Sequence, residues 1–288
     1  MKLMLGTAQF GRNYGIANKN GRPPTEEVFK IFEMAKNNNI SFIDTGNDYG
    51  VSEDLIGDIS TKLGFSFNTV TKIYLNSSAT SIKDEINKSL ERLKTDCLFG
   101  LLVHNPNDLL SPGSDEWIDT FLDFKKRNLV KHIGVSAGTV DQILKIIDIY
   151  PIDIVQVPLN VFDQRFADVI TILKERNIKI HVRSVFLQGL ILMDTKNINE
   201  YFTDIESNIE QLNNVSKQHN ISVRKLAMEY IKSLDIDNIV VGIDNLEQLK
   251  TLIYEYNEPF AHSIDFKQFA VKDERFINPG RWPIGGWR

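Results

Sequence analysis

The sequence has almost no cysteine: Cys97 is the only one in 288 residues. A single cysteine excludes an internal disulfide, and it is compatible with a reducing compartment. Apolar runs long enough to span a membrane are also missing. The N-terminal segment Met1-Lys2-Leu3-Met4-Leu5-Gly6 reaches a glycine too early for the apolar region of a secretory signal. We therefore expect a cytoplasmic protein with no membrane association.

Charge of one sign is not concentrated anywhere in the chain. The net charge is -5, from 33 basic and 38 acidic residues that are interleaved. Without a basic block or stripe, a nucleic-acid partner is not expected. The five histidines are scattered without the spacing of metal ligands, so no metal site is predicted. The hydrophobic and charged fractions, 42% and 25%, are those of an ordinary globular protein.

Short apolar runs alternate with amphipathic segments along the whole chain. Several runs are apolar without alternation, as expected of strands buried on both faces of a parallel sheet. The runs predict eight strands, at residues 3–5, 41–44, 69–71, 98–103, 132–135, 154–157, 178–182 and 239–241.

The intervening segments have the apolar spacing of helices. Val28, Ile31, Phe32 and Ala35 share one helical face, and Thr25 is a candidate N-cap before them. Eight strands with helices between them indicate an α/β fold, a closed (β/α)8 barrel that forms a single domain over residues 1–288. An open doubly wound sheet is the alternative. The predicted helices cover residues 25–38, 53–63, 82–93, 115–127, 140–149, 164–176, 204–219, 222–233 and 245–256.

Polar, titratable side chains stand where three consecutive predicted strands end. Asp44 ends the strand at 41–44 and Tyr49 lies in the loop that follows it. Lys72 and His104 directly follow the next two strands. In (β/α)8 barrels the working residues come from the carboxyl ends of the strands. We therefore expect these four side chains to converge in one pocket.

The four residues have a common chemical interpretation. An ammonium such as Lys72, held charged by Asp44, favours a nearby phenolate, so the pKa of Tyr49 should fall toward neutrality. His104 could orient a carbonyl oxygen. Together they would polarise a carbonyl and protonate its oxygen, with Tyr49 as the proton donor, while hydride arrives at carbon. No side chain supplies hydride, so a nicotinamide cofactor is implied.

Other interpretations of the same residues remain open. Taken one at a time, Asp44 could be a turn cap, Tyr49 a packing residue, and Lys72 and His104 ordinary loop residues. A barrel isomerase or aldolase with a Schiff base on Lys72 is a further alternative, but it leaves Tyr49 and His104 unexplained. Their joint placement at consecutive strand ends favours reduction of an aldehyde, ketone or sugar carbonyl to an alcohol.

The segments around these residues resemble motifs of the aldo-keto reductase family. Phe42-Ile43-Asp44-Thr45-Gly46-Asn47-Asp48-Tyr49-Gly50 resembles the motif that bears the family's catalytic aspartate and tyrosine. Val70-Thr71-Lys72 resembles the lysine motif, and Leu102-Val103-His104-Asn105-Pro106 resembles the segment with its histidine. The matches run in order over nearly the whole chain. The resemblance implies a barrel that binds a nicotinamide dinucleotide without a Rossmann domain.

The resemblance also assigns cofactor-binding residues. Ser136 and Gln156 match the serine and glutamine that hold the carboxamide, and Ser184 matches a serine near the pyrophosphate. Residues 240–249 resemble the loop that grips the adenosine end, which includes Gly242, Asp244 and Gln248. A looser resemblance to members of bacterial surface-sugar metabolism suggests a sugar or sugar nucleotide as the small-molecule substrate.

Three positions depart from the family pattern. Ala137 stands where an asparagine is usual, and Arg183 replaces the aromatic residue that stacks on the nicotinamide. These two departures leave a second function open, a cofactor-binding regulatory or scaffold protein with little turnover. Asp244 stands where many relatives have an arginine for the 2′-phosphate. Family habit therefore favours NADP(H), Asp244 favours NAD(H), and on balance we expect NADP(H).

The C-terminal tail, residues 278–288, is too rich in glycine and proline for a helix. Aromatic faces suit sugar rings, and guanidinium groups bind carboxylates or phosphates. We therefore expect Arg281, Trp282 and Trp287 to contact substrate. The alternatives are a strap that packs its tryptophans on the barrel, or a subunit contact.

Overall fold

The structure is a computed structural model that describes residues 1–75 and 79–283. Its strands all pair in parallel and in chain order, and β8 pairs with β1 to close a barrel. The predicted (β/α)8 barrel is therefore confirmed. The strands are β1 (Lys2–Gly6), β2 (Phe42–Asp44), β3 (Asn68–Ile73), β4 (Leu98–Val103), β5 (Val130–Ser136), β6 (Ile154–Pro158), β7 (Lys179–Arg183) and β8 (Asn238–Gly242).

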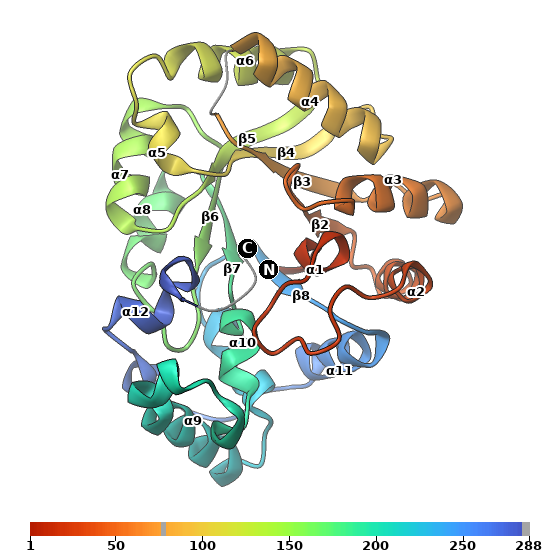
Figure 1. Cartoon of the computed structure of the whole chain (residues 1–288). Coiled ribbons are helices and arrows are strands. Elements are labelled where there is room, and N and C mark those ends of the chain that lie inside the picture. Colours follow the sequence, from red (N-terminus) through yellow and green to blue (C-terminus); the bar gives the residue numbers. More distant parts are fainter. Residues whose placement is uncertain (76–78, 284–288) are drawn as a thin grey trace.

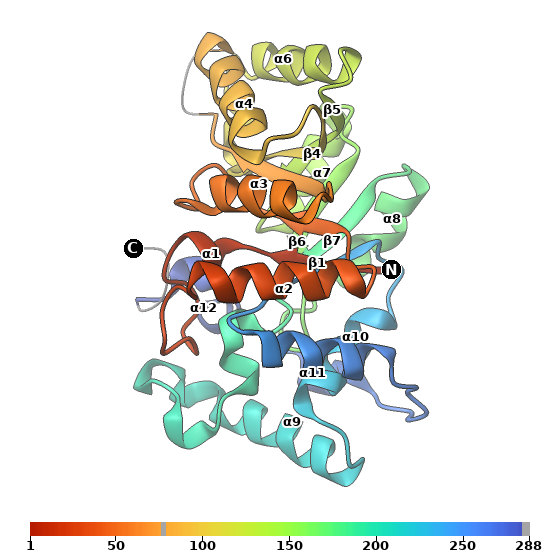
Figure 2. The ribbon, with the colours of Figure 1, turned by 90° about the vertical axis from the view of Figure 1, so that its right-hand side faces the viewer.

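Helices surround the barrel, as Figure 1 shows with the strands at its centre. Figure 2 shows the same barrel from the side, with α1 and α12 at one end and the start of β1 at the other. Both α9 and α10 lie between β7 and β8, in agreement with the two helices predicted at residues 204–219 and 222–233. The helices are α1 (Ala8–Gly11), α2 (Thr25–Asn37), α3 (Ser52–Leu63), α4 (Ala79–Leu93), α5 (Pro106–Leu109), α6 (Asp115–Lys126), α7 (Val140–Ile149), α8 (Ile170–Glu175), α9 (Glu206–Gln218), α10 (Val223–Lys232), α11 (Leu246–Asn257) and α12 (Glu274–Ile277).

The start of α2 differs from the sequence prediction. Thr25 is the first helical residue, and Pro24 holds the N-cap position without a side-chain hydrogen bond. A proline has no side-chain acceptor, so this helix begins without the cap that was expected of Thr25. None of the helices in the described ranges is long and apolar enough to cross a membrane.

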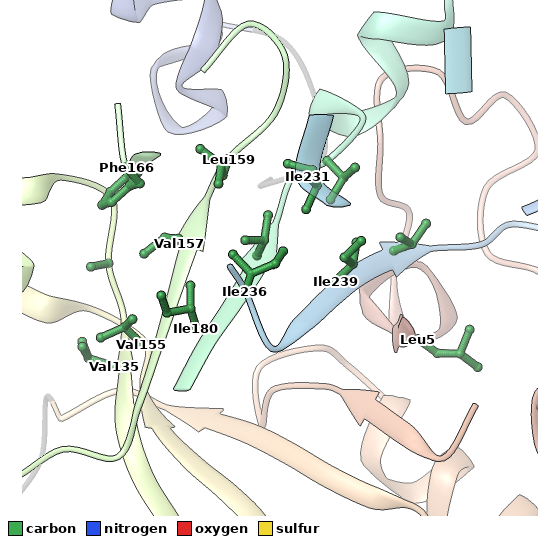
Figure 3. Packing of buried hydrophobic residues seen from close by; sticks show 14 of the residues in the cluster. Leu5, Val135, Val155, Val157, Leu159, Phe166, Ile180, Ile231, Ile236 and Ile239 are labelled. Atoms are coloured by element: carbon green, nitrogen blue, oxygen red, sulfur yellow. The ribbon is translucent and has the colours of Figure 1, made fainter. Parts of the chain in front are cut away.

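The main core lies between the strands and the helices. Val155, Ile180 and Ile239 come from the neighbouring strands β6, β7 and β8 and belong to one buried cluster with Ile231 of α10 (Figure 3). Full burial of such a side chain contributes about 1.5–3 kcal/mol. This layer fixes the outer face of each strand, so the alternate residues must point into the barrel.

The barrel interior holds a second, smaller apolar cluster. It consists of inward-pointing residues from six strands: Met4, Phe42, Val70, Leu102, Ile154 and Val240. Since side chains alternate along a strand, the residue two positions further on also points inward, one layer higher. The residues two positions after the cluster members on β2, β3 and β4 therefore lie on top of the apolar layer.

Candidate active site

Three of the predicted residues lie two positions after a member of the interior cluster. Asp44 follows Phe42 of β2, Lys72 follows Val70 of β3, and His104 follows Leu102 of β4 by this spacing. Each therefore stands above the apolar layer, at the carboxyl end of the barrel. All three line one cavity of about 500 Å³ together with Tyr49.

Lys72 is the centre of the cluster. Its ammonium donates to Asp44 Oδ2 at 2.7 Å, to the carbonyl of Thr45 at 2.8 Å and to the hydroxyl of Tyr49 at 3.4 Å. The exposed fractions of the Lys72 and Asp44 side chains are 1% and 6%. A buried ammonium in contact with a phenol can stabilise the negative charge that the phenol acquires when it gives up its proton.

The pKa of Tyr49 differs from the expected direction. Burial and the nearby charges of Asp44 and Asp48 raise the pKa of this phenol above its ordinary range, while Arg183 and Arg12 oppose them. The expectation of a pKa near neutrality was wrong because Asp44 compensates the charge of Lys72, while desolvation penalises the phenolate. Tyr49 therefore keeps its proton at neutral pH, as a proton donor must.

His104 is held at the edge of the same cavity. Its Nδ1 lies 3.4 Å from Asp48 Oδ1, and its ring stacks on Tyr74 with centroids 4.5 Å apart. Desolvation lowers the pKa of His104, with Lys72 adding to the effect and Asp48 opposing it. A neutral imidazole beside Tyr49 can orient a carbonyl oxygen by a hydrogen bond.

Tyr49 is positioned by a close approach of two loops. A Cβ at Gly11 would lie 1.5 Å from the carbonyl oxygen of Tyr49, and one at Gly50 would lie 2.3 Å from that of Gly11. Gly50 also has a φ of +58°, a conformation that favours glycine. The phenol ring has the guanidinium of Arg12 4.8 Å from its centroid. The loop after β1 thus fixes the backbone and the ring of Tyr49.

Ser136, Gln156 and Arg183 lie in the same cavity. The Gln156 amide donates to Asp44 Oδ1 at 2.6 Å and accepts from the Ser136 hydroxyl at 3.4 Å. Arg183 donates to the carbonyl of Ala137 at 3.4 Å, so the two departures from the family pattern are in contact. This arrangement joins the residues predicted to hold the nicotinamide to the cluster around Lys72.

The other predicted cofactor residues also line the cavity, toward α11. They are Ser184, Gly242, Asp244 and Gln248. Asp244 accepts weak hydrogen bonds of 3.4 Å from Asn18 and from Gln248. Burial raises the pKa of Asp244, and Gln248 opposes the effect.

Two loops approach each other beside the cavity. A Cβ at Gly189, which has a φ of +92°, would lie 2.4 Å from the Cβ of Ala17. Ser184, Leu187 and Gln188 also have positive φ values, so this segment after β7 is tightly turned. The cavity is thus lined by the cluster around Lys72 and by residues of the loops after β1, β7 and β8.

Within the described part of the tail, Arg281 and Trp282 do not line this cavity, contrary to the prediction that they contact substrate there. Trp282 is buried, donates to the carbonyl of Phe276 at 3.1 Å and packs edge-on against Phe202. Arg281 pairs with Glu274 at 2.7 Å on the surface. Trp282 thus has the packing role of a strap, because its indole is buried and packs against the ring of Phe202. Trp287 lies outside the described residues.

Sequence reasoning missed several residues around Tyr49. Asp48 lies in the segment 42–50 and was not predicted as a site residue, although it contacts both Arg12 and His104. Tyr14 and Tyr74 also line the cavity. The position of Arg12 in a loop after a barrel strand was the signal that could have identified it.

The sequence of this chain matches a known protein family and several of its members. A model of the aldo/keto reductase family matches residues 2–266. The uncharacterized oxidoreductase YqkF from Bacillus subtilis (strain 168) is 23% identical over 256 residues, which cover 80% of this chain and 82% of that protein. The NADH-specific methylglyoxal reductase from Escherichia coli (strain K12) is 25% identical over 177 residues, which cover 53% of this chain and 54% of that protein.

Solved structures share the fold. The holo form of the aldo-keto reductase AKR11C1 from Bacillus halodurans has a TM-score of 0.75 and 18% identity, over 93% of this chain and 90% of that chain. An eight-stranded parallel barrel with a family match over nearly its whole length defines an enzyme of the oxidoreductase class that uses a nicotinamide cofactor. The chain belongs to the aldo-keto reductase family.

Proposed function

We propose that this chain reduces a carbonyl to an alcohol with NAD(P)H, and that Tyr49 is the proton donor. The observation that carries the proposal is the chain of contacts at the end of the cavity. The Tyr49 hydroxyl lies 3.4 Å from Lys72 Nζ, which lies 2.7 Å from Asp44.

Each residue then has a defined task. When bound, a nicotinamide cofactor would supply the hydride that the carbonyl carbon accepts. Tyr49 gives its proton to the carbonyl oxygen, and Lys72 stabilises the phenolate that remains. Asp44 keeps Lys72 charged and in place, and the neutral His104 orients the carbonyl oxygen. Tyr49 is a weak acid before the reaction. Its proton transfers when hydride addition makes the carbonyl oxygen strongly basic.

The residues along the cavity fit a dinucleotide. Ser136, Gln156 and Arg183 would hold the nicotinamide end, next to the proton donor. Ser184 would lie near the pyrophosphate. At the other end, Gly242 and the residues after it would contact the adenosine, beside the start of α11, where a helix terminus favours anions.

The charges at the adenosine end favour NAD(H) over NADP(H). Asp244 lines the cavity there. A second carboxylate, Glu27, accepts from the backbone N–H of Leu246 at the start of α11 at 2.7 Å. The cavity-lining Arg224 already lies 3.4 Å from Glu255. Of the carboxylates of Asp244 and Glu27, that of Asp244 lines the cavity and would repel a 2′-phosphate there, which supports NAD(H) against the family habit. By its name, one relative is also specific for NADH.

Asp244→Arg should shift the preference toward NADPH. The substitution changes the local charge by two units beside the ribose, and at a partly exposed site this is worth about 1–3 kcal/mol. We expect the ratio of the NADPH and NADH dissociation constants to change by about tenfold or more in favour of NADPH. Asp244→Asn, which changes the charge by one unit, should give a smaller shift. An unchanged ratio in both variants would place the ribose elsewhere.

The proposed reaction is tested by cofactor oxidation. The purified chain is incubated with NADH or NADPH and a panel of aldehydes, ketones and keto-sugars, and the absorbance of the reduced cofactor is followed. The proposal expects turnover with at least one carbonyl. Tight cofactor binding without turnover on any member of the panel would favour the regulatory or scaffold alternative. A keto-sugar preferred over simple ketones would support the sugar substrate.

A further inference from the structure

We infer that Arg183 makes this chain bind the reduced nicotinamide more tightly than the oxidised one. The inference rests on the proposed function, because it assumes that the cofactor occupies the cavity. The oxidised nicotinamide ring carries one positive charge and the reduced ring carries none. A fixed cation beside the ring therefore distinguishes the two forms by Coulomb repulsion.

Arg183 is the cation of this part of the cavity that lacks a counter-charge. Lys72 is paired with Asp44 at 2.7 Å, and Arg12 is paired with Asp48 at 3.1 Å. Arg183 contacts only neutral oxygens, the Ala137 carbonyl and the Ser184 hydroxyl, both at 3.4 Å. In residues 1–75 and 79–283, neither of the two hydrogen bonds of its guanidinium goes to a carboxylate, and it forms no ion pair.

The charge of Arg183 reaches the groups that define the reaction centre. It acts on Tyr49, on His104 and on Tyr14, and these come from loops on other sides of the cavity. The hydride must pass to the carbon whose oxygen takes the proton of Tyr49. The reacting ring would therefore occupy the cavity that Tyr49 and Arg183 both line.

The charged side chains around Tyr49 carry a net positive charge before any ligand binds. The two carboxylates of Asp44 and Asp48 are offset by Lys72 and Arg12, and His104 is neutral because its pKa is lowered by burial. Arg183 leaves one net positive charge. The oxidised ring would add a second positive charge, whereas the reduced ring would add none.

The consequence concerns the equilibrium between bound forms. If the reduced cofactor binds about tenfold more tightly than the oxidised one, the two-electron potential of the bound couple is raised by about 30 mV. The oxidised product then leaves readily after each turnover, and a reduced cofactor replaces it. Arg183 would thereby favour release of the oxidised cofactor, while the raised potential makes hydride transfer from the bound reduced cofactor slightly less favourable.

The test measures binding and needs no turnover. Dissociation constants for NAD⁺ and NADH, and for NADP⁺ and NADPH, are determined by calorimetry for the wild-type chain and for Arg183→Met, Arg183→Gln and Arg183→Lys. Arg224→Met is the matched control, because Arg224 also lines the cavity but already lies 3.4 Å from a carboxylate of Glu255. Thermal melting confirms that each variant is folded, and Arg183→Gln keeps a donor for the Ala137 carbonyl if the methionine does not fold.

The readout is the ratio of the oxidised to the reduced dissociation constant. We expect this ratio to fall about tenfold in Arg183→Met and Arg183→Gln, since a partly exposed charge is screened. Arg183→Lys should keep most of the ratio, and Arg224→Met should leave it unchanged even where both forms bind more weakly. A ratio that is the same in Arg183→Met, Arg183→Gln and the wild type would overturn the inference.

The failure of the proposed function would look different. A wild-type chain that binds neither form of either dinucleotide would refute the proposed function and this inference together. A chain that binds both forms with the expected ratios but turns over no carbonyl would refute the proposed reaction and leave the role of Arg183 supported.

Discussion

Replacing Tyr49 by phenylalanine should lower kcat for carbonyl reduction about 10²–10⁴-fold, the usual contribution of a general acid. The hydroxyl is needed when the carbonyl oxygen acquires negative charge, so the loss should appear in kcat more than in KM. The ring itself should remain in place. Arg12 and Lys72 lie 4.8 and 5.0 Å from its centroid, and phenylalanine offers the same face to both.

Two measurements complete this test. Cofactor dissociation constants and the melting temperature of Tyr49→Phe should stay close to those of the wild type, because only the hydroxyl has been removed. Tyr74→Phe is the matched control, since Tyr74 also lines the cavity and stacks on His104 but has no hydrogen bond from Lys72 among the described contacts. Activity of Tyr49→Phe within a few-fold of the wild type would remove Tyr49 from its role.

Much of the site was predictable from sequence because the barrel imposes a simple rule. Alternation along a strand and a common carboxyl end place Asp44, Lys72 and His104 in one layer as soon as the strands are recognised. The strands themselves were recognisable because runs such as Leu98–Val103, which is buried along nearly its whole length, are apolar without a break. Here local pattern and global fold agree, so short-range reasoning was sufficient.

The parts that escaped prediction depend on contacts between segments far apart in the chain. The approach of Gly11 to Gly50, the pairing of Arg12 with Asp48 and the contact of Arg183 with Ala137 all join separate loops. The spacing of apolar residues along the sequence reflects local secondary structure and does not predict contacts between distant loops. The burial of Trp282 by Phe202 is of the same kind, since composition alone suits both a packed strap and a sugar-binding surface.

The pKa of Tyr49 was misjudged for a related reason. The sequence shows that an ammonium is near the phenol, but it does not show how deeply the phenol is buried or that Asp48 also faces it. Desolvation and two carboxylates together outweigh the cations. The direction of a pKa shift is thus a property of the folded pocket, and it reverses the expected resting state of Tyr49 without removing its role.

Beneath the active site, His181 should make the fold sensitive to acid. It lies on β7, two positions before Arg183, and pairs in register with Gln156 of β6 and Asn238 of β8. Its ring is fully buried, and neither ring nitrogen has a hydrogen-bond partner among the described residues. A protonated imidazole would therefore be a buried charge with no direct partner.

Burial lowers the pKa of His181 from 6.5 to about 4. Asp44 and Asp237 face it and raise the pKa, whereas Lys72 and His132 lower it. Since the unfolded chain takes up the proton first, the stability tied to this residue is complete above pH 6.5 and is lost as the pH falls toward 4. A shift of this size corresponds to about 3 kcal/mol of unfolding free energy.

The measurement is urea unfolding of the wild type and of His181→Leu at pH values from about 7.5 to about 4. This range includes the pKa of His181 in the unfolded and in the folded chain. Carboxylates that do not face His181 contribute equally to both proteins, so the difference between them reports His181 together with its effect on Asp44 and Asp237. Over the interval from pH 6.5 to 4, the wild type should lose about 3 kcal/mol more than His181→Leu. His262→Asn, at an exposed histidine, should follow the wild type. Parallel loss of stability in the wild type and His181→Leu would mean that the His181 ring is protonated in the fold without penalty, and that its burial does not set the acid sensitivity of this barrel.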